Sequence, residues 1–162
     1  MFQNIRKFPP LAFFVICFLI PALSGAEETG NQPRAVELSA KLGWTPAEAI
    51  NWLGSPLSLF AYRGTETSDD NVVFYYQDHL YLFWFQDRVW QVRADERWVG
   101  DVDGVRMGMT LPEVIDFWGP PINNRDENPT WTLPDRGYPG RVRLYFGYDK
   151  RLADIYVYRS DW

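Results

Sequence analysis

The chain has 162 residues, of which 16 are lysine or arginine and 21 are aspartate or glutamate, so its formal net charge is −5. An acidic chain is poorly suited to binding nucleic acid, because phosphate contacts need clustered cations, and equally unsuited to holding anionic lipid by charge alone. With one cysteine and one histidine, the sequence also excludes an internal disulfide framework and supplies too few ligands for an ordinary zinc site.

Residues 1–26 predict a cleavable secretory signal. Arg6 and Lys7 give it a positive start, residues 11–23 are almost wholly apolar, and the small residues 24–26 offer a cleavage site. The apolar run is about a dozen residues, against the ~20 that a membrane-spanning helix needs, so an uncleaved anchor is the less favoured alternative. We therefore expect an exported protein, periplasmic or extracellular, with no stable membrane insertion after cleavage.

Cleavage after Ala26 would also remove Cys17, the single cysteine. A bacterial lipoprotein places its cysteine behind a small residue after the apolar run, whereas Ile16 precedes Cys17 within the run. We therefore expect no lipid anchor, and a fold that holds without disulfides. Residues 27–34 read as a disordered leader before the folded part.

The main feature of the mature chain is a repeated segment. Residues 43–56 align with residues 108–121 at a constant offset of 65, and six of the fourteen positions are identical. Both copies have the pattern of a short helix with both ends specified: a Thr-x-x-Glu capping box at the start and a glycine at the end. The residues predicted to form these structural caps are Thr45, Glu48, Gly54, Thr110, Glu113 and Gly119. The two glutamates could instead be a catalytic pair, but the cap explains both more simply.

Segments rich in β-branched and aromatic residues follow each helix and predict antiparallel strands. They are residues 72–77, 80–86 and 88–93 after the first helix, and 131–133, 142–148 and 151–159 after the second. The predicted fold class is α+β: two tandem units, residues 35–97 and 98–162, each a short capped helix or helix pair on a three-stranded meander. Residues 35–42 suggest a further short helix. The two units would share one core or one continuous sheet, because each is too small to be stable alone.

The pattern Gly-x-Thr-x-x-Glu-Ala/Val-x-x-x-x-Gly-x-Pro, followed by an aromatic-rich meander, resembles the BamE/SmpA–OmlA family of bacterial envelope proteins. The tandem arrangement resembles the β-lactamase inhibitor protein fold. The resemblance implies a non-enzymatic protein that acts by contact, either assisting outer-membrane assembly or gripping an enzyme with the concave face of its sheet. The chain departs from the first by having two units and no lipid-accepting cysteine, and from the second by lacking disulfides.

Alternation along the strands predicts which residues face a partner. Val142, Leu144, Phe146 and Tyr148 would lie under the helices, and alignment of the units places Tyr81, Phe83 and Phe85 with them. The opposite, open face would then bind a protein through side-chain types that are frequent in interfaces. The predicted binding residues are Leu82, Trp84, Arg143, Tyr145, Tyr156 and Tyr158, and Asp154 would stand on the same face. The alternative is that both faces are covered.

No recognisable catalytic constellation appears. His79 falls in a predicted hairpin turn, and residues 101–104 (Asp-Val-Asp-Gly) have the wrong spacing for a calcium loop. The sequence therefore predicts a protein-binding module of the envelope, such as an assembly or scaffold factor, with an unidentified protein partner and neither metal nor cofactor. Two alternatives stay open: an inhibitor of a secreted or periplasmic hydrolase and, more remotely, an enzyme of unrecognised type.

Overall fold

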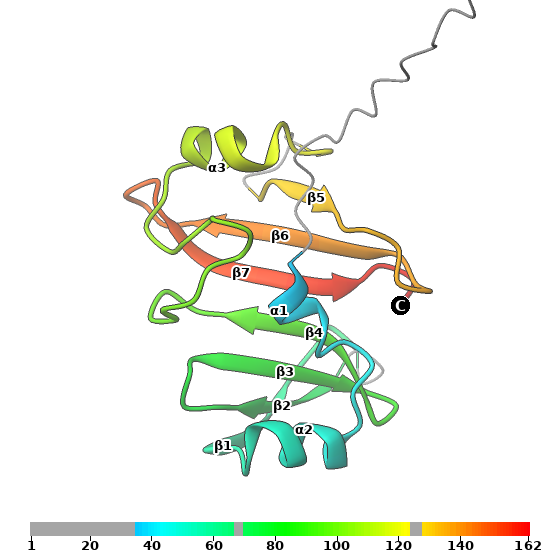
Figure 1. Cartoon of the computed structure of the whole chain (residues 1–162). Coiled ribbons are helices and arrows are strands. Elements are labelled where there is room, and N and C mark those ends of the chain that lie inside the picture. Colours follow the sequence, from blue (N-terminus) through cyan, green and yellow to red (C-terminus); the bar gives the residue numbers. More distant parts are fainter. Residues whose placement is uncertain (1–34, 67–69, 124–127) are drawn as a thin grey trace, which may run out of the picture.

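The computed structural model describes residues 35–66, 70–123 and 128–162, so the predicted signal and leader lie outside the described residues. This part of the chain has an α+β fold in which one antiparallel sheet carries its helices on a single face (Figure 1). The helices are α1 (Val36–Ser39), α2 (Pro46–Leu53) and α3 (Leu111–Trp118). The strands are β1 (Ser58–Tyr62), β2 (Asn71–Tyr75), β3 (Leu80–Phe85), β4 (Arg88–Ala94), β5 (Thr130–Thr132), β6 (Gly140–Phe146) and β7 (Leu152–Arg159).

The sheet has seven strands in the order β1-β2-β3-β4-β7-β6-β5, and it is continuous across both halves of the chain. β4 and β7 pair antiparallel at its centre, with Val92 opposite Val157. The prediction of three strands in each half is correct for the second half and wrong for the first. There, β1 adds a fourth strand, which the pattern search missed.

Helices α2 and α3 begin and end as their sequences predict. The backbone N–H of Thr45 donates to the Glu48 carboxylate at 2.8 Å, and that of Thr110 donates to Glu113 at 2.7 Å. Each helix is followed by a glycine with positive φ, 78° at Gly54 and 71° at Gly119. Helices this short do not persist alone, so tertiary contacts must stabilise them.

The loops that lead into α2 and α3 are attached to the sheet by the same two backbone bonds. The N–H of Gly43 donates to the carbonyl of Val89 at 2.7 Å, and that of Gly108 donates to Leu152 at 2.8 Å. In the opposite direction, the N–H of Val89 donates to the carbonyl of Trp44 at 3.0 Å, and the N–H of Leu152 donates to the carbonyl of Met109 at 2.7 Å. Arg88 and Arg151 reinforce them by donating to the carbonyls of Gly43 and Gly108, respectively.

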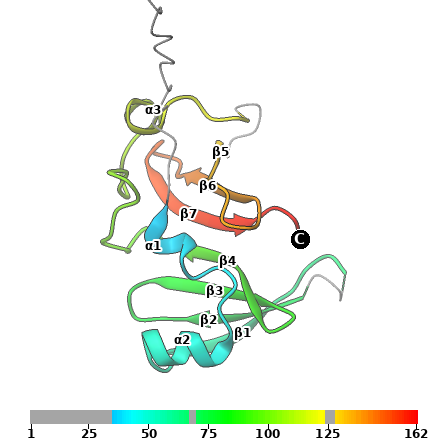
Figure 2. The same ribbon diagram turned by 45° about the vertical axis from the view of Figure 1, so that its right-hand side comes forward.

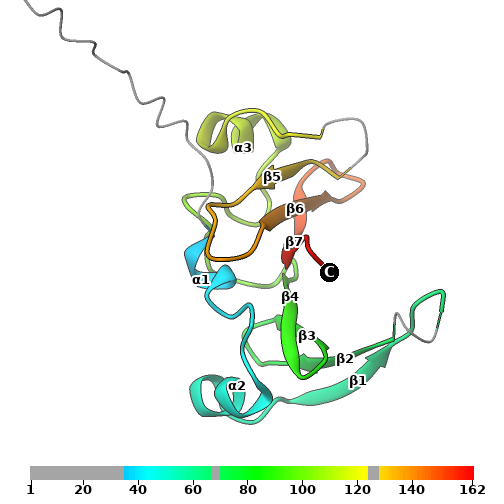
Figure 3. The same cartoon turned by 90° about the vertical axis from the view of Figure 1, so that its right-hand side faces the viewer.

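The core lies between the helices and one face of the sheet. Figures 2 and 3 show α1 over the centre of the sheet, with α2 and α3 toward its two ends. Removal of apolar side chains from water stabilises such a core by roughly 25 cal/mol per Å². Side chains with no exposed surface include Leu38, Ala49, Leu82, Val92, Val114, Val142, Leu144, Ile155 and Val157. Across the described ranges, no helix has both the length and the apolarity to cross a membrane.

The two margins of the sheet differ. At the β5 margin, the N–H of Ile122 donates to the carbonyl of Thr130 at 2.8 Å, and Asn123 forms a bridge with Thr130. At the other margin, β1 pairs with β2 along one side, carries no charged residue, and is exposed along its whole length. Residues 122 and 123 therefore cover the β5 margin, whereas β1 is an exposed edge strand.

A groove on the open face of the sheet

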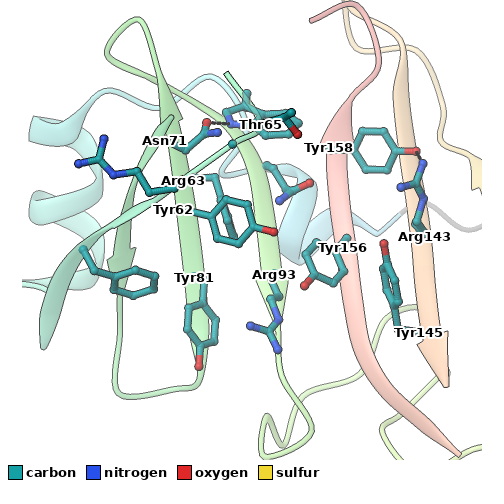
Figure 4. A pocket seen from close by; sticks show the side chains of 15 residues that line it. Tyr62, Arg63, Thr65, Asn71, Tyr81, Arg93, Arg143, Tyr145, Tyr156 and Tyr158 are labelled. Carbon is teal, nitrogen blue, oxygen red and sulfur yellow. Dashed lines mark hydrogen bonds between the residues drawn. The ribbon is translucent and has the colours of Figure 1, made fainter. Parts of the chain in front are cut away.

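The face of the sheet opposite the helices forms a groove of about 620 Å³. In Figure 3, β1 and β2 run out toward this open side, so they form one wall of the groove. Side chains of β3, β4, β6 and β7 form its floor, as Figure 4 shows. The lining residues are Phe60, Tyr62, Arg63, Gly64, Thr65, Asn71, Tyr81, Phe83, Trp90, Gln91, Arg93, Arg143, Tyr145, Tyr156 and Tyr158.

Tyrosine and arginine alternate along one row of paired residues across the floor. We call Tyr81, Arg93, Tyr156 and Arg143 the central row. Arg93 lies directly opposite Tyr81 on β3 and opposite Tyr156 on β7, and Tyr156 in turn lies opposite Arg143 on β6. Residues at the same register share a face of the sheet, so the four side chains stand side by side.

Arg93 occupies the middle of this row with its charge neutralised. Its Nε and Nη2 each lie 2.6 Å from Oδ1 of Asp154. Its guanidinium lies 4.8 Å from the ring centroid of Tyr81 and 5.6 Å from that of Tyr156. Burial raises the pKa of the Asp154 carboxyl, although the contact with Arg93 opposes that rise.

Tyr156 is the most shielded phenol of the row. Burial raises its pKa to about 12, and the nearby Arg93 only partly opposes the rise. The hydroxyl therefore stays protonated at neutral pH. The Tyr156 ring meets that of Tyr145 edge-on, with the centroids 5.0 Å apart, so these two rings brace one another on the groove floor.

Arg143 ends the row on β6, among tyrosines. Its Nη2 donates to the Tyr158 hydroxyl at 3.0 Å, and its guanidinium lies 5.2 Å from the Tyr158 ring centroid. Among the ion pairs of the described residues, none involves Arg143. Figure 4 shows it beside Tyr145, Tyr156 and Tyr158.

Four of the six predicted binding residues line the groove: Arg143, Tyr145, Tyr156 and Tyr158. The other two, Leu82 and Trp84, were assigned to the wrong face. Leu82 has no exposed surface and Trp84 only 6 %, and both belong to the core under the helices. Trp84 packs there against Phe74, with ring centroids 4.8 Å apart.

The error is a register slip of one residue. The sequence alignment placed Tyr81 and Phe83 with Val142 and Leu144 on the helix-covered face, whereas both line the groove. A slip of one position exchanges the two faces of a strand. The two halves are offset by 65 residues at the helices, but by 63 at Val89 and Leu152, which bind the loops before the helices, and by 62 at Leu82 and Leu144. The connections between these elements differ in length, so β3 and β6 do not keep the offset of the helices.

The groove also contains residues that the sequence reasoning missed. Tyr62 comes from the unpredicted strand β1, and its ring meets Phe83 edge-on at 5.8 Å. Trp90 stands at the β4 bulge, where its indole N–H donates to Asn71 at 2.7 Å. Tyr81 and Arg93 could have been predicted from the sequence, because side chains alternate between the two faces along β3 and β4 and both residues fall on the groove face.

A polar cluster adjoins the groove at the end of β4. Asp95, only 5 % exposed, accepts a hydrogen bond from the Tyr81 hydroxyl at 2.8 Å and another from Arg97 at 2.8 Å. Burial opposes ionisation, but the bonds from Arg97 and Tyr81 outweigh it and lower the pKa of Asp95 to about 2. The ring Nδ1 of His79 lies 3.0 Å from the Tyr75 hydroxyl and 3.7 Å from Asp95. Within the described ranges, no group of three or more His, Cys, Asp or Glu side chains could hold a metal ion.

Comparison with known proteins gives no family. No family model matches the chain, and no curated protein matches it. Among solved structures, it is similar to an extracellular protein containing an SCP domain from Bacillus anthracis, with a TM-score of 0.50 and 11 % identity over 98 % of this chain. It spans 51 % of that protein, about half its length. A DUF4309 family protein from Bacillus subtilis aligns with 72 % of this chain and 78 % of its own, at a TM-score of 0.44 and 13 % identity.

Proposed function

We propose that the protein is an exported, non-enzymatic protein-binding module of the bacterial envelope, and that it holds its partner in the groove on the open face of the sheet. The observation that carries this proposal is the central row within a groove of about 620 Å³. Tyrosine and arginine are enriched where protein interfaces concentrate their binding energy. Here they are fixed by neighbouring strands, so little conformational entropy is lost when a partner binds.

We further propose that the two halves of the chain are copies of one unit. The shared helix caps support this, and so do the matching bonds that attach the loop before each helix to β4 or β7. In this view the units correspond to residues 35–97 and 98–162. The proposal agrees with the resemblance to BamE/SmpA–OmlA proteins and to the tandem β-lactamase inhibitor protein fold.

An assembly or scaffold factor and an inhibitor of a secreted hydrolase would use the same surface. The inhibitor is supported by the shape of the site, since an open groove on a continuous sheet can receive an exposed loop of a folded enzyme. The scaffold is supported by the helix motif that resembles BamE/SmpA–OmlA proteins. The identity of the partner separates the two.

A capture experiment tests the proposal. The chain without its predicted signal is immobilised and exposed to envelope and secreted fractions of its source organism. Tyr145→Ala removes a groove ring, and Tyr148→Ala is the matched control, because Tyr148 is fully exposed and lies outside the groove lining. We expect wild type and Tyr148→Ala to capture the same partner and Tyr145→Ala to lose it, with all three melting at similar temperatures.

Equal capture by Tyr145→Ala would contradict binding in the groove. Capture of membrane or cell-wall machinery by the wild type would indicate a scaffold. Capture of one soluble hydrolase, with loss of its activity, would indicate an inhibitor.

A further inference from the structure

The charge of the groove is opposite to that of the chain. The full chain carries a net charge of −5. The 15 residues that line the groove include three arginines and neither aspartate nor glutamate. A concave surface with one sign of charge attracts ligands of the other sign, so the groove favours an acidic ligand within an otherwise acidic protein.

Two of the three arginines already have carboxylate partners. Arg63 pairs with Asp70, and Arg93 pairs with Asp154 at 2.6 Å. Both acids lie outside the groove lining. These pairs neutralise much of the charge that Arg63 and Arg93 would present to a ligand.

Arg143 is different. Its hydrogen bond to Tyr158 goes to a neutral hydroxyl, and within the described parts of the chain no carboxylate lies within 4.0 Å of its guanidinium. The side chain is half-buried among Tyr145, Tyr156 and Tyr158. A cation held among aromatic rings in such a place binds a carboxylate more strongly than one in open water, because the local dielectric constant is lower.

We propose that Arg143 binds the side-chain carboxylate of an aspartate or glutamate of the partner protein. This inference rests on the proposed function, since it names the group that the partner brings into the groove. The guanidinium keeps donors beyond the one used by Tyr158, so it can hold a carboxylate while that bond persists. The flanking tyrosines would contact the neighbouring residues of the same segment.

Arg141 provides a matched control. It stands two residues before Arg143 on β6, on the same face of the sheet, opposite Tyr158. It is exposed and lies outside the groove lining. Replacing Arg141 removes the same charge from the same strand while leaving the groove intact.

The direct test uses a short, end-blocked peptide of glutamates, with the matching peptide of glutamines as its neutral counterpart. Binding is followed by NMR of the arginine side-chain N–H groups. We expect the glutamate peptide alone to shift the Arg143 signal. Arg143→Gln should weaken its binding about tenfold or more, Arg143→Lys should keep part of it, and Arg141→Gln should leave it nearly unchanged.

The inference would be overturned by equal shifts from the glutamine peptide, by a shift with inorganic phosphate but none with the glutamate peptide, or by undiminished binding in Arg143→Gln. Thermal melting of each variant shows that it is folded. The capture experiment separates this inference from the proposal beneath it. If Tyr145→Ala loses the partner and Arg143→Gln keeps it, the acidic contact is wrong and the binding groove stands; if both keep it, the proposed function fails.

Discussion

Arg93 and Tyr156 lie directly opposite each other on the central strand pair, with the guanidinium 5.6 Å from the phenol ring centroid. Arg93 stands four residues after Val89, the β4 residue that binds the loop before α2. Tyr156 stands four residues after Leu152, the β7 residue that binds the loop before α3. Two residues at the same distance from these loop attachments therefore meet at the centre of the sheet. Because one is arginine and the other tyrosine, the groove is chemically asymmetric there.

The contact between Arg93 and Asp154 should be measurable by a double-mutant cycle. We expect Arg93→Gln to lower the free energy of unfolding by about 2 kcal/mol, because it leaves a half-buried carboxylate unpaired. Asp154→Asn in the same chain should recover about 1 kcal/mol of that loss. Urea denaturation of the wild type, both single variants and the double variant provides the measurement. Strictly additive effects would show that the two side chains do not interact.

Trp84 should behave as a core residue. We expect Trp84→Ala to cost about 3–5 kcal/mol, the range for removal of a large buried ring. Its indole N–H has no hydrogen-bond partner among the described residues, so Trp84→Phe should be much milder. Trp52→Ala is the control: Trp52 is 71 % exposed on α2, and its loss should change stability by less than about 0.5 kcal/mol. If chemical denaturation showed that Trp84→Ala loses as little stability as Trp52→Ala, the assignment of Trp84 to the helix-covered face would be wrong.

Asp95 should make stability depend on acid pH. The folded pKa is about 2, below the ordinary 3.8, so ionised Asp95 stabilises the fold above about pH 4. That contribution, about 2 kcal/mol for a shift of this size, is lost as the pH falls from about 4 to 2. We expect Asp95→Asn to be less stable than the wild type at pH 7, and the gap to narrow toward pH 2. Denaturant titrations at each pH measure this difference. If the stability difference between the wild type and Asp95→Asn stayed constant from pH 4 to pH 2, ionisation of Asp95 would not be its cause.

Replacing Gly104 by alanine should destabilise the fold more than the same change at Gly137, a glycine of similar backbone conformation. Gly104 and Gly137 both have φ of +87°, but a Cβ at Gly104 would lie 2.8 Å from the Phe117 ring, whereas one at Gly137 meets nothing within 4 Å. We expect Gly104→Ala to lower the free energy of unfolding by about 1 kcal/mol more than Gly137→Ala. In a Phe117→Ala background the excess should vanish; if it persists, the ring is not its cause.

The helices could be predicted well because their ends are local. Thr45 with Glu48 and Thr110 with Glu113 specify each start within four residues, and Gly54 and Gly119 specify each end. The interactions that form a cap lie within one turn of chain, so no knowledge of the tertiary fold is needed. The hairpin turn at His79, between β2 and β3, was predictable for the same reason.

The faces of the strands were harder, because they depend on register. The offset of 65 residues that relates the helices does not hold for β3 and β6, and a register error of one residue placed Leu82 and Trp84 on the wrong side of the sheet. In the second half the prediction is correct for Val142 and Leu144, which are buried, and for Arg143 and Tyr145, which line the groove. It is wrong for Tyr148, predicted under the helices, which is fully exposed because β6 ends at Phe146. Strand β1 was missed because its residues are exposed on both faces and show no alternation of apolar and polar types.

Because the two margins of the sheet differ, the two ends of the molecule are not alike. At the β5 margin, residues 122 and 123 already occupy the position of a further strand. At the β1 margin, an uncharged edge carries Phe60 and Tyr62, which also line the groove. An extended segment from another chain can therefore lengthen the sheet in one direction only, and a segment added there would deepen the same wall against which the partner rests.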